Sequence, residues 1–390
     1  MKYCFISSQF PNLDDMDNNH ATPFLYNYAK YLTELGNEVT VIHCMREYPK
    51  IFSFLAKFLK KIGIHRLDKY LFNVNMCSDK EYVFDGIRIF RFTYKKYIPH
   101  SSAARSQINK LYGKVIKSDA ACGCDVIISD FLDPSLPIAS KLKKKYSKKV
   151  GQVIHVTDYS FLKKMKPLLS YVDFWLFRAK SQYDTVSQYV RVDRQFIMPS
   201  GIEEEVLPKE PVFRSKVKNL LFVGRIEKDK GIDTILTALS KLPENRFFLT
   251  VVGDGSETYN YKQMARSLGI DDCIRFIGKV PHSDVFGYMQ KSDALIMISH
   301  ETFGMVYVEA MSQGCIPIGA SGEGIDGIVK DGENGFLCPL KDSQALADKL
   351  SYISEIDCTE ISRAAYATAC EMTNKNLAEK FDGYIKSYEI

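Results

Sequence analysis

The stretch His300–Ala320, HETFGMVYVEAMSQGCIPIGA, decides the fold because a helix and a buried strand follow one another within it. Thr302 is suited to the N-cap of a helix that we expect over residues 304–313, and Gly314 is suited to its C-terminal stop. The apolar run 316–320 then predicts a buried strand. A helix followed at once by such a strand is typical of a βαβ unit in a parallel sheet.

The same alternation extends outward from this stretch. In the second half we predict strands at 219–224, 247–253, 274–278, 294–299 and 316–320, and helices at 231–242, 257–268, 282–290 and 304–313. In the first half we predict a helix at 24–35 and strands at 3–8, 38–43, 86–92, 125–129, 151–156, 174–177 and 195–198. The predicted fold is α/β, with two doubly wound, Rossmann-like domains.

The length of 390 residues agrees with two domains of similar size. The polar stretch after Gly201, which contains two prolines, predicts the linker between them. We therefore expect an N-terminal domain over 1–200, a C-terminal domain over 201–372, and a C-terminal helix over 373–390 that packs back on the first domain. Ligands of open parallel sheets bind beyond the carboxyl ends of the strands, so two such domains would face each other across a ligand-binding cleft.

The composition is that of a globular protein without a membrane-spanning segment. Hydrophobic residues make up 46% and charged residues 25% of the chain, and no apolar run reaches the length of a transmembrane helix. The start, MKYCFISSQFPN, lacks the pattern of a signal peptide, so we expect a cytoplasmic protein. The ten cysteines have no zinc-site spacing, and we expect them to be reduced.

The charge is divided unevenly between the two halves. Residues 1–200 contain 31 Lys/Arg against 18 Asp/Glu, a balance of +13, and the remainder contains 21 against 29, a balance of −8. This asymmetry predicts that the first half faces an anionic membrane, a phosphorylated acceptor or nucleic acid. Uneven solvated surface is the alternative.

Two basic segments favour the membrane. Residues 50–72 place Ile51, Leu55, Phe58 and Ile62 on one helical face beside six Lys/Arg. The cluster KLKKKYSKK (141–149) adds further positive charge. We expect peripheral attachment to an anionic membrane surface on the cytoplasmic face; the alternative for the helix at 50–72 is packing on its own domain.

Two loops at predicted strand ends carry groups suited to a diphosphate. In FVGRIEKDKG, Arg225 follows the strand and Lys230 precedes the next helix, so two cations and exposed helix amides would meet negative charge there. In VVGDGSE, Gly253 and Gly255 form a tight turn between strand and helix. The alternative for the first loop is a solvated basic loop. The alternative for the second is a turn that serves only tight packing.

Two glutamates flank the helix of the opening stretch. Glu301 follows a strand, and Glu309 lies inside the helix roughly 9 Å further along its axis. The amides of Phe303, Gly304 and Met305 lie between them. The arrangement suits a ligand with hydroxyl groups at both ends and phosphates between, because buried carboxylates need such partners. Either glutamate singly also fits a purely structural role.

These motifs together resemble glycosyltransferase family 4, the retaining sugar transferases of the GT-B fold. The resemblance covers most of residues 218–350 and is looser in the first half. The residues that carry it are GR at 224–225, KG at 230–231, GDG at 253–255, ETFGMVYVE at 301–309 with the following AMSQGCIPIGAS, and DGENGFL at 331–337.

The resemblance implies a hexosyltransferase that uses a UDP- or GDP-sugar donor and a lipid-linked or polysaccharide acceptor in cell-surface glycan synthesis. It implies no cofactor, no metal and no nucleic-acid partner. It implies the following roles: Arg225 and Lys230 bind the donor diphosphate, Glu309 the ribose, Glu301 the transferred sugar, the backbone at Lys279 and Val280 the base, and Gly224, Gly253, Phe303, Gly304 and Met305 line the donor site.

Three positions depart from the family pattern. The first loop, DDMDNNHATPF, lacks the Gly-Gly pair common in the family, so Asn19, His20 and Ala21 are expected to line that turn. The slot of a His-Asp pair is Thr157-Asp158, with His155 two residues earlier on the same predicted strand face. Gly327 replaces a glutamate of many relatives. The acceptor side is thus assigned to Asp158, His155 and His20.

Two other classes of function compete with this one. A nucleotide-dependent oxidoreductase requires GxGxxG after the first strand, and ISSQFPNLDD has no glycine. The alternative is a GT-B protein that binds or isomerises nucleotide-sugars without transferring the sugar, or that recruits partners.

Overall fold

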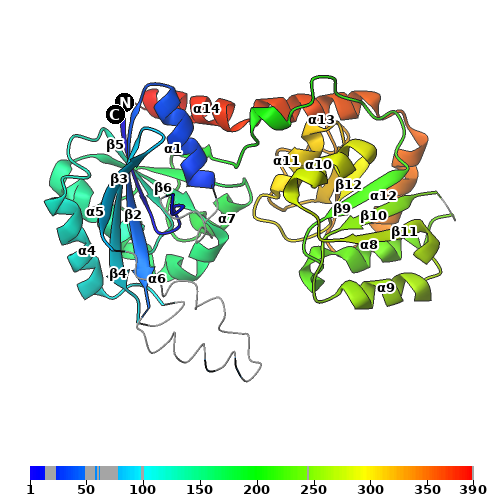
Figure 1. The fold of residues 1–390 in the computed structure, drawn as a ribbon, viewed down its shortest axis with the longest axis horizontal. Helices are drawn as coiled ribbons and strands as arrows, with labels where there is room; N and C mark the ends of the chain where they lie inside the picture. Colours follow the sequence, from blue (N-terminus) through cyan, green and yellow to red (C-terminus); the bar gives the residue numbers. More distant parts are fainter. Residues whose placement is uncertain are drawn as a thin grey trace. The chain divides into compact units, whose positions relative to one another are not determined.

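The computed structural model describes residues 1–13, 23–48, 58, 61, 78–97, 101–243 and 246–388. The chain divides into two compact units, each built on its own mainly parallel sheet (Figure 1). Unit 1 comprises Met1–Phe177, Gln182–Met198 and Ala378–Ile390, and unit 2 comprises Arg178–Ser181 and Pro199–Leu377. The predicted α/β class with two doubly wound sheets is confirmed.

The sheet of unit 1 has eight strands in the order β3-β4-β2-β1-β5-β6-β7-β8. Only β3 runs antiparallel to its neighbour. The strands are β1 (Lys2–Ser7), β2 (Glu38–Glu47), β3 (Lys80–Phe84), β4 (Ile87–Lys95), β5 (Val126–Asp130), β6 (Lys149–Ile154), β7 (Phe174–Phe177) and β8 (Gln195–Ile197). The buried apolar runs of β1 and β5 place these strands in the middle, as expected for a sheet covered on both faces.

Different helices cover the two faces of this sheet. Tyr3 of β1 points to one face, where its hydroxyl donates to Asp382 at 2.7 Å and its ring meets Phe381. Cys4 and Ile6 alternate to the other face and share a core with α4 and α5. The helices of unit 1 are α1 (Phe24–Glu34), α4 (Arg105–Lys117), α5 (Ser135–Tyr146), α6 (Tyr159–Leu169), α7 (Gln182–Ser187) and the part of α14 (Asn374–Lys386) from Ala378 onward.

The sheet of unit 2 has six parallel strands in the order β11-β10-β9-β12-β13-β14. The strands are β9 (Asn219–Val223), β10 (Phe248–Val252), β11 (Ile274–Gly278), β12 (Ala294–Ile296), β13 (Ile316–Ala320) and β14 (Phe336–Cys338). The chain builds outward from β9 in one direction and then from β12 in the other. The strand order therefore reverses between these two neighbours, and this reversal positions the candidate site.

Helices cover both faces of the second sheet and share one core with it. They are α8 (Ile232–Leu239), α9 (Thr258–Ser267), α10 (His282–Lys291), α11 (Met305–Ser312), α12 (Ser343–Glu355) and α13 (Thr359–Glu371). Short 3-10 turns are η3 (Val156–Asp158) in unit 1 and η4 (Glu204–Val206), η5 (Lys228–Lys230) and η6 (Asp271–Cys273) in unit 2. Within the described residues, no helix is long and apolar enough to cross a bilayer.

The predicted N-cap of the helix in the opening stretch is wrong. The helix begins at Met305, and the capping position is Gly304, which has φ 79° and provides no side-chain cap. A Cβ at Gly304 would lie 2.6 Å from the ring of Tyr307, so the left-handed backbone and the close aromatic ring both favour glycine. Thr302 instead lies in the turn before the helix.

Two predicted strands are shorter than expected. The strand expected at 294–299 ends at Ile296, and the strand expected at 151–156 ends at Ile154. The second difference has a clear cause, because Asp158 accepts a hydrogen bond from the amide of His155 at 2.9 Å and closes a 3-10 turn there. The expectation that His155 and Thr157 share a strand face is therefore wrong.

Candidate functional site

The candidate site of unit 2 lies where the strand order reverses. The loop after β9 carries Arg225 and Lys230, and the loop after the neighbouring strand β12 carries Glu301. The carboxyl ends of adjacent parallel strands meet at one edge of the sheet, so these loops lie side by side.

Lys230 and Glu301 form an ion pair at this edge. The Nζ of Lys230 lies 2.6 Å from Oε1 of Glu301, and the side chains are only 13% and 19% exposed. The Ser299 hydroxyl donates to the same oxygen at 3.3 Å. Among the described residues, none donates to the second oxygen, Oε2. The pair therefore presents a partly desolvated cation and a carboxylate with one free oxygen.

Gly231 allows the two loops to approach closely. Its φ is 69°, and a Cβ at this position would lie 2.0 Å from the carbonyl oxygen of Ile298. A side chain would thus collide with the backbone that follows β12. Glycine here brings Lys230 within reach of Glu301.

Arg225 lies at the start of the same loop with its side chain exposed. Within the described chain its guanidinium group has no ion-pair or hydrogen-bond partner. The loop itself is held by backbone hydrogen bonds to the neighbouring turn: Gly224 N donates to Val252 O at 3.0 Å, and Ile226 N donates to Asp254 O at 3.1 Å. Gly253 N in turn donates to Gly278 O at 2.9 Å. A fixed backbone thus carries an available guanidinium group, which suits an incoming anion.

Glu323 braces the backbone beside Glu301. Its Oε1 lies 2.8 Å from Nδ1 of His300, and its Oε2 accepts the amide of Glu301 at 3.2 Å. The amide of Gly324 also donates to the carbonyl of Glu301 at 2.9 Å. These contacts fix the direction in which the Glu301 side chain leaves the loop.

The first turn of α11 provides amide groups near this carboxylate. Met305 and Val306 are its first helical residues, and such amides have no acceptor within their own helix. Tyr307 N is used locally, because it donates to Gly304 O at 3.0 Å. The Phe303 side chain is buried in the core, so only its backbone is available to a ligand.

Tyr307 ties this helix to β12. Burial raises the pKa of its hydroxyl well above the ordinary value, so the group stays protonated. It donates to the carbonyl of Met297 at 2.5 Å. This contact connects the helix that carries Glu309 to the strand end that precedes Glu301.

Glu309 lies further along α11 and is 14% exposed. Its Oε1 lies 3.1 Å from Nε2 of His282, at the start of α10. Burial raises the pKa of the Glu309 carboxyl, and the interactions with His282 oppose that rise. A desolvated carboxylate with one exposed partner is suited to accept ligand hydroxyls.

Lys279 and Val280 lie in the loop between β11 and α10, three and two residues before His282. Lys279 is exposed, and Val280 is half-buried against the core of the unit. The contact between His282 and Glu309 therefore connects this loop to α11.

In unit 1, His155 follows β6 at the corresponding edge of the other sheet. Its Nε2 lies 2.7 Å from Oδ1 of Asp130, at the end of β5. The Ser7 hydroxyl, at the end of β1, donates to Oδ2 of the same carboxylate at 2.6 Å. The Phe131 ring stacks on the imidazole with 3.7 Å between centroids. Three strand ends therefore fix one imidazole ring.

Asp158 is buried, and its carboxylate binds backbone amides. It accepts the amides of Leu132 and His155, each at 2.9 Å. Burial, opposed by the nearby His155 and these amides, raises its pKa to about 6. Asp158 therefore positions the His155 loop. His20, the third residue predicted on the acceptor side, lies outside the described residues.

Sequence reasoning missed several residues of these networks, among them Ser7, Asp130, His282 and Glu323. Asp130 directly follows the predicted strand at 125–129, and a polar residue at a strand end is a signal that could have identified it. No sequence signal could have identified Glu323, because its contact with the Glu301 amide depends on the course of the loop after β13. Among the described residues, no cluster of three His, Cys, Asp or Glu side chains has the arrangement of a metal site.

Comparison with known proteins finds a family model that matches part of unit 2. Residues 203–369 match the family described as "Glycosyl transferases group 1". The chain is 32% identical over 145 residues to N-acetyl-alpha-D-glucosaminyl L-malate synthase of Bacillus anthracis, which is 37% of this chain and 38% of that protein. It is 32% identical over 161 residues to the phosphatidyl-myo-inositol mannosyltransferase of Mycobacterium leprae, which is 39% of this chain and 42% of the relative. The matches thus span about two fifths of these relatives.

Solved structures match over nearly the full length. Sucrose-phosphate synthase from Thermosynechococcus elongatus has a TM-score of 0.66 at 17% identity, covering 99% of this chain and 98% of the other. Anabaena HepE in complex with UDP and glucose has a TM-score of 0.62 at 17% identity, covering 99% and 100%. The chain has the GT-B fold. At this identity the likeness shows the fold alone.

Proposed function

We propose that this chain is a retaining hexosyltransferase of glycosyltransferase family 4. It would move a sugar from a UDP- or GDP-sugar to a lipid-linked or polysaccharide acceptor in cell-surface glycan synthesis, at the cytoplasmic face of a membrane. The observation that carries the proposal is the Lys230–Glu301 pair at the reversal of strand order, with an exposed Arg225 in the same loop as Lys230. The group 1 match over residues 203–369 supports it.

The proposed reaction breaks the bond between the anomeric carbon and the diphosphate oxygen and forms one to an acceptor hydroxyl on the same face. The acceptor proton passes to the departing diphosphate oxygen, so no side chain acts as a base. Negative charge grows on the diphosphate, where Arg225, Lys230 and the first amides of α11 stabilise it. Glu301 accepts a hydroxyl of the sugar through its free oxygen, and Glu309 accepts the ribose hydroxyls.

We propose that the reaction needs no divalent cation, because two side-chain cations and a helix N-terminus supply the positive charge that Mg²⁺ often supplies to a diphosphate. A chelator should therefore leave turnover unchanged, and restored activity on adding Mg²⁺ or Mn²⁺ to a chelated, inactive sample would refute this point.

The central experiment is a panel of UDP- and GDP-sugars with the purified chain. Release of the nucleoside diphosphate, followed over time, would support transfer or donor hydrolysis. UDP-sugars are tested first, since UDP is bound in the HepE neighbour. The anomeric configuration of the product, read by NMR, tests retention. Tight donor binding, with no release of the nucleoside diphosphate in the presence of any acceptor preparation, would favour a nucleotide-sugar-binding protein instead.

Glu301→Gln provides the internal control. It keeps a side-chain acceptor but removes the charge that pairs with Lys230, so turnover should fall more than nucleotide affinity. If both quantities stayed at wild-type values, the assignment of this edge as the donor site would be wrong.

A further inference from the structure

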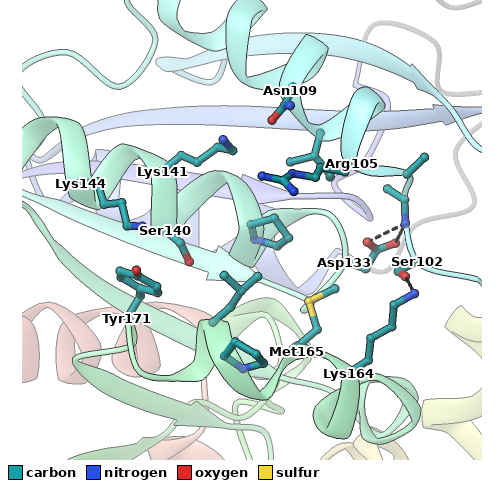
Figure 2. Close-up of a pocket in the computed structure, with 16 residues that line it drawn as sticks. Ser102, Arg105, Asn109, Asp133, Ser140, Lys141, Lys144, Lys164, Met165 and Tyr171 are labelled. Carbon is teal, nitrogen blue, oxygen red and sulfur yellow. Dashed lines mark hydrogen bonds between the residues drawn. The ribbon is translucent and has the colours of Figure 1, made fainter.

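A concave site lies in unit 1, and its lining includes none of the residues assigned above to the candidate sites. It is a cavity of about 690 Å³ between α4, α5 and α6 (Figure 2). This volume lies in the range of pockets that hold small organic molecules.

Four cations line this cavity: Arg105 of α4, Lys141 and Lys144 of α5, and Lys164 of α6. Arg105 and Lys141 extend toward the same part of the pocket from different helices, and Lys164 stands at the opposite end (Figure 2). Within the described part of the chain none of the four belongs to an ion pair. Cations held together without counter-charge repel one another, and a bound anion relieves that repulsion.

The carboxylate in the lining, Asp133, is already engaged. It accepts the amide of Ala103 at 2.9 and 3.1 Å and lies 3.7 Å from Nζ of Lys96, and its side chain is only 4% exposed. Lys164 donates a hydrogen bond to the Ser102 hydroxyl, and Lys144 lies over the Tyr171 ring at 4.7 Å. Neither contact neutralises a lysine, so the pocket keeps its positive potential.

Apolar side chains form another part of the lining, beside the polar Ser102, Asn109, Ser140 and Tyr171. Ile108, Pro137, Met165 and Leu168 contribute from the same three helices. A bare phosphate would use only the cations, whereas a molecule with a phosphate and an adjoining apolar part would cover both kinds of surface. The lining therefore favours an anionic amphiphile.

The three helices around the pocket are themselves rich in positive charge. Together α4, α5 and α6 contain 11 Lys/Arg and no Asp or Glu. Two of these lysines are paired, Lys114 with Asp79 and Lys143 with Asp173. In contrast, α1 and α14, which meet the other face of the sheet, contain four lysines against three Asp/Glu. A one-sided cationic face is suited to an anionic membrane surface.

We propose that this cavity binds the phosphate headgroup of an anionic membrane lipid. The phosphate would lie between Arg105, Lys141 and Lys144, and the glycerol and first acyl carbons would lie over Pro137, Met165 and Leu168. The inference rests on the part of the proposed function that places the chain at an anionic membrane. The inference adds that the chain attaches to the membrane through α4, α5 and α6.

The test titrates the full chain with soluble dihexanoyl phosphatidylglycerol. Two matched probes accompany it: dihexanoyl phosphatidylcholine, which has the chains without net charge, and glycerol 3-phosphate, which has the phosphate without chains. We expect saturable binding of the first probe and at least tenfold weaker binding of each of the others. The pocket cations repel the choline cation of the phosphatidylcholine probe, and glycerol 3-phosphate lacks the apolar contact.

Three triple variants with equal loss of charge locate the site. R105A/K141A/K144A removes the pocket cations and should weaken the phosphatidylglycerol probe on the order of 100-fold. K110A/K117A/K145A removes cations of α4 and α5 that do not line the cavity. K262A/R266A/K291A removes exposed cations of α9 and α10 in unit 2. Both controls should bind the soluble probe within about threefold of wild type, since they leave the pocket contacts intact.

Two substitutions at one position test the pocket without removing any lysine. Ala104 is exposed and lines the cavity at the N-cap of α4. Ala104→Glu puts a carboxylate at the rim and should weaken the probe about tenfold, whereas Ala104→Gln, of the same size, should not. Circular dichroism of each variant confirms folding.

Several outcomes would overturn the proposal: equal binding of glycerol 3-phosphate, which would make this a site for a soluble phosphate; equal binding of the phosphatidylcholine probe; or equal losses in all three triple variants. Donor turnover with a soluble acceptor is measured in parallel. Retained turnover with no lipid binding would reject this inference alone, and lipid binding without turnover would reject the transferase proposal alone.

Discussion

The carboxyl edges of the two sheets differ in how far their charged side chains are already paired. In unit 2, Arg225 is exposed and Glu301 keeps a free oxygen, so the charged groups can exchange partners with a ligand. In unit 1, the carboxylate of Asp130 is 2% exposed and both its oxygens are used, by Ser7 and His155. The first edge is arranged for binding charge, and the second for holding one imidazole in a fixed orientation.

The largest expected effect is that of Lys230→Ala on the unit 2 edge. The change removes one cation from the proposed leaving group and leaves Glu301 without its partner. We expect turnover to fall by about 10²–10³-fold, equivalent to about 3–4 kcal/mol in the barrier. Lys228→Ala is the matched control, because that side chain is 83% exposed in the same turn. Equal losses in both variants would indicate a general charge effect and remove the contrast between the edges.

The next largest effect is expected on the pH dependence of the unfolding free energy, through the buried carboxyl of Asp158 in unit 1. Its folded-state pKa, about 6, is above the ordinary value near 4, so the folded state binds the proton more tightly. The stability from this group is therefore present below about pH 4 and lost as the pH rises through about 6.

Asp158→Asn abolishes this titration. Denaturant melts at several pH values should show the unfolding free energy of the wild type, relative to that of the variant, falling by about 2 kcal/mol from pH 4 to pH 7. Asp193→Asn, at an exposed carboxyl, is the control. A difference independent of pH would mean that Asp158 is not protonated in this range and that burial does not dominate this edge.

Glu309→Gln in unit 2 should weaken nucleotide binding about 10–100-fold, because hydrogen bonds to a charged acceptor contribute about 1.5–3 kcal/mol. Glu333→Gln, at an exposed glutamate of the same unit, should have no effect.

The pH dependence of this binding has a defined sign. Burial raises the Glu309 pKa, so nucleotide affinity should decline as the pH falls and the carboxylate is protonated. His282→Ala removes the interaction that opposes the rise and should shift the decline to higher pH. Calorimetric titrations over a pH series would measure the shift; a shift to lower pH would contradict this account of the pair.

The smallest effect is expected for Asp130→Asn in unit 1. The amide keeps one acceptor for His155 or Ser7 but not both charged contacts, so turnover should fall about tenfold with donor affinity unchanged. Ser7→Ala, which removes the other partner of the same carboxylate, should have a smaller effect. A loss of donor affinity in Asp130→Asn would show that the two edges are not distinct in role.

The sequence predicted much of unit 2 because its signals are local. Strand, turn and helix follow one another in short segments there, so the pattern of residues was enough to assign Arg225, Lys230 and Glu301 to strand ends. The predicted cap at Thr302 was wrong because the choice of Gly304 depends on the ring of Tyr307 packed beneath it. Glu323 was missed because a loop after another strand brings it to the Glu301 amide.

The sequence alone determined the α/β class, the two sheets and the charge asymmetry, since periodicity, glycine positions and composition act locally along the chain. Tertiary structure decided which charges are free and which are satisfied. Ser7, Asp130 and His155 lie on three separate strands or the loops that directly follow them, and Arg105, Lys141 and Lys164 lie on three separate helices. Their proximity depends on strand order and helix packing, which no local pattern encodes.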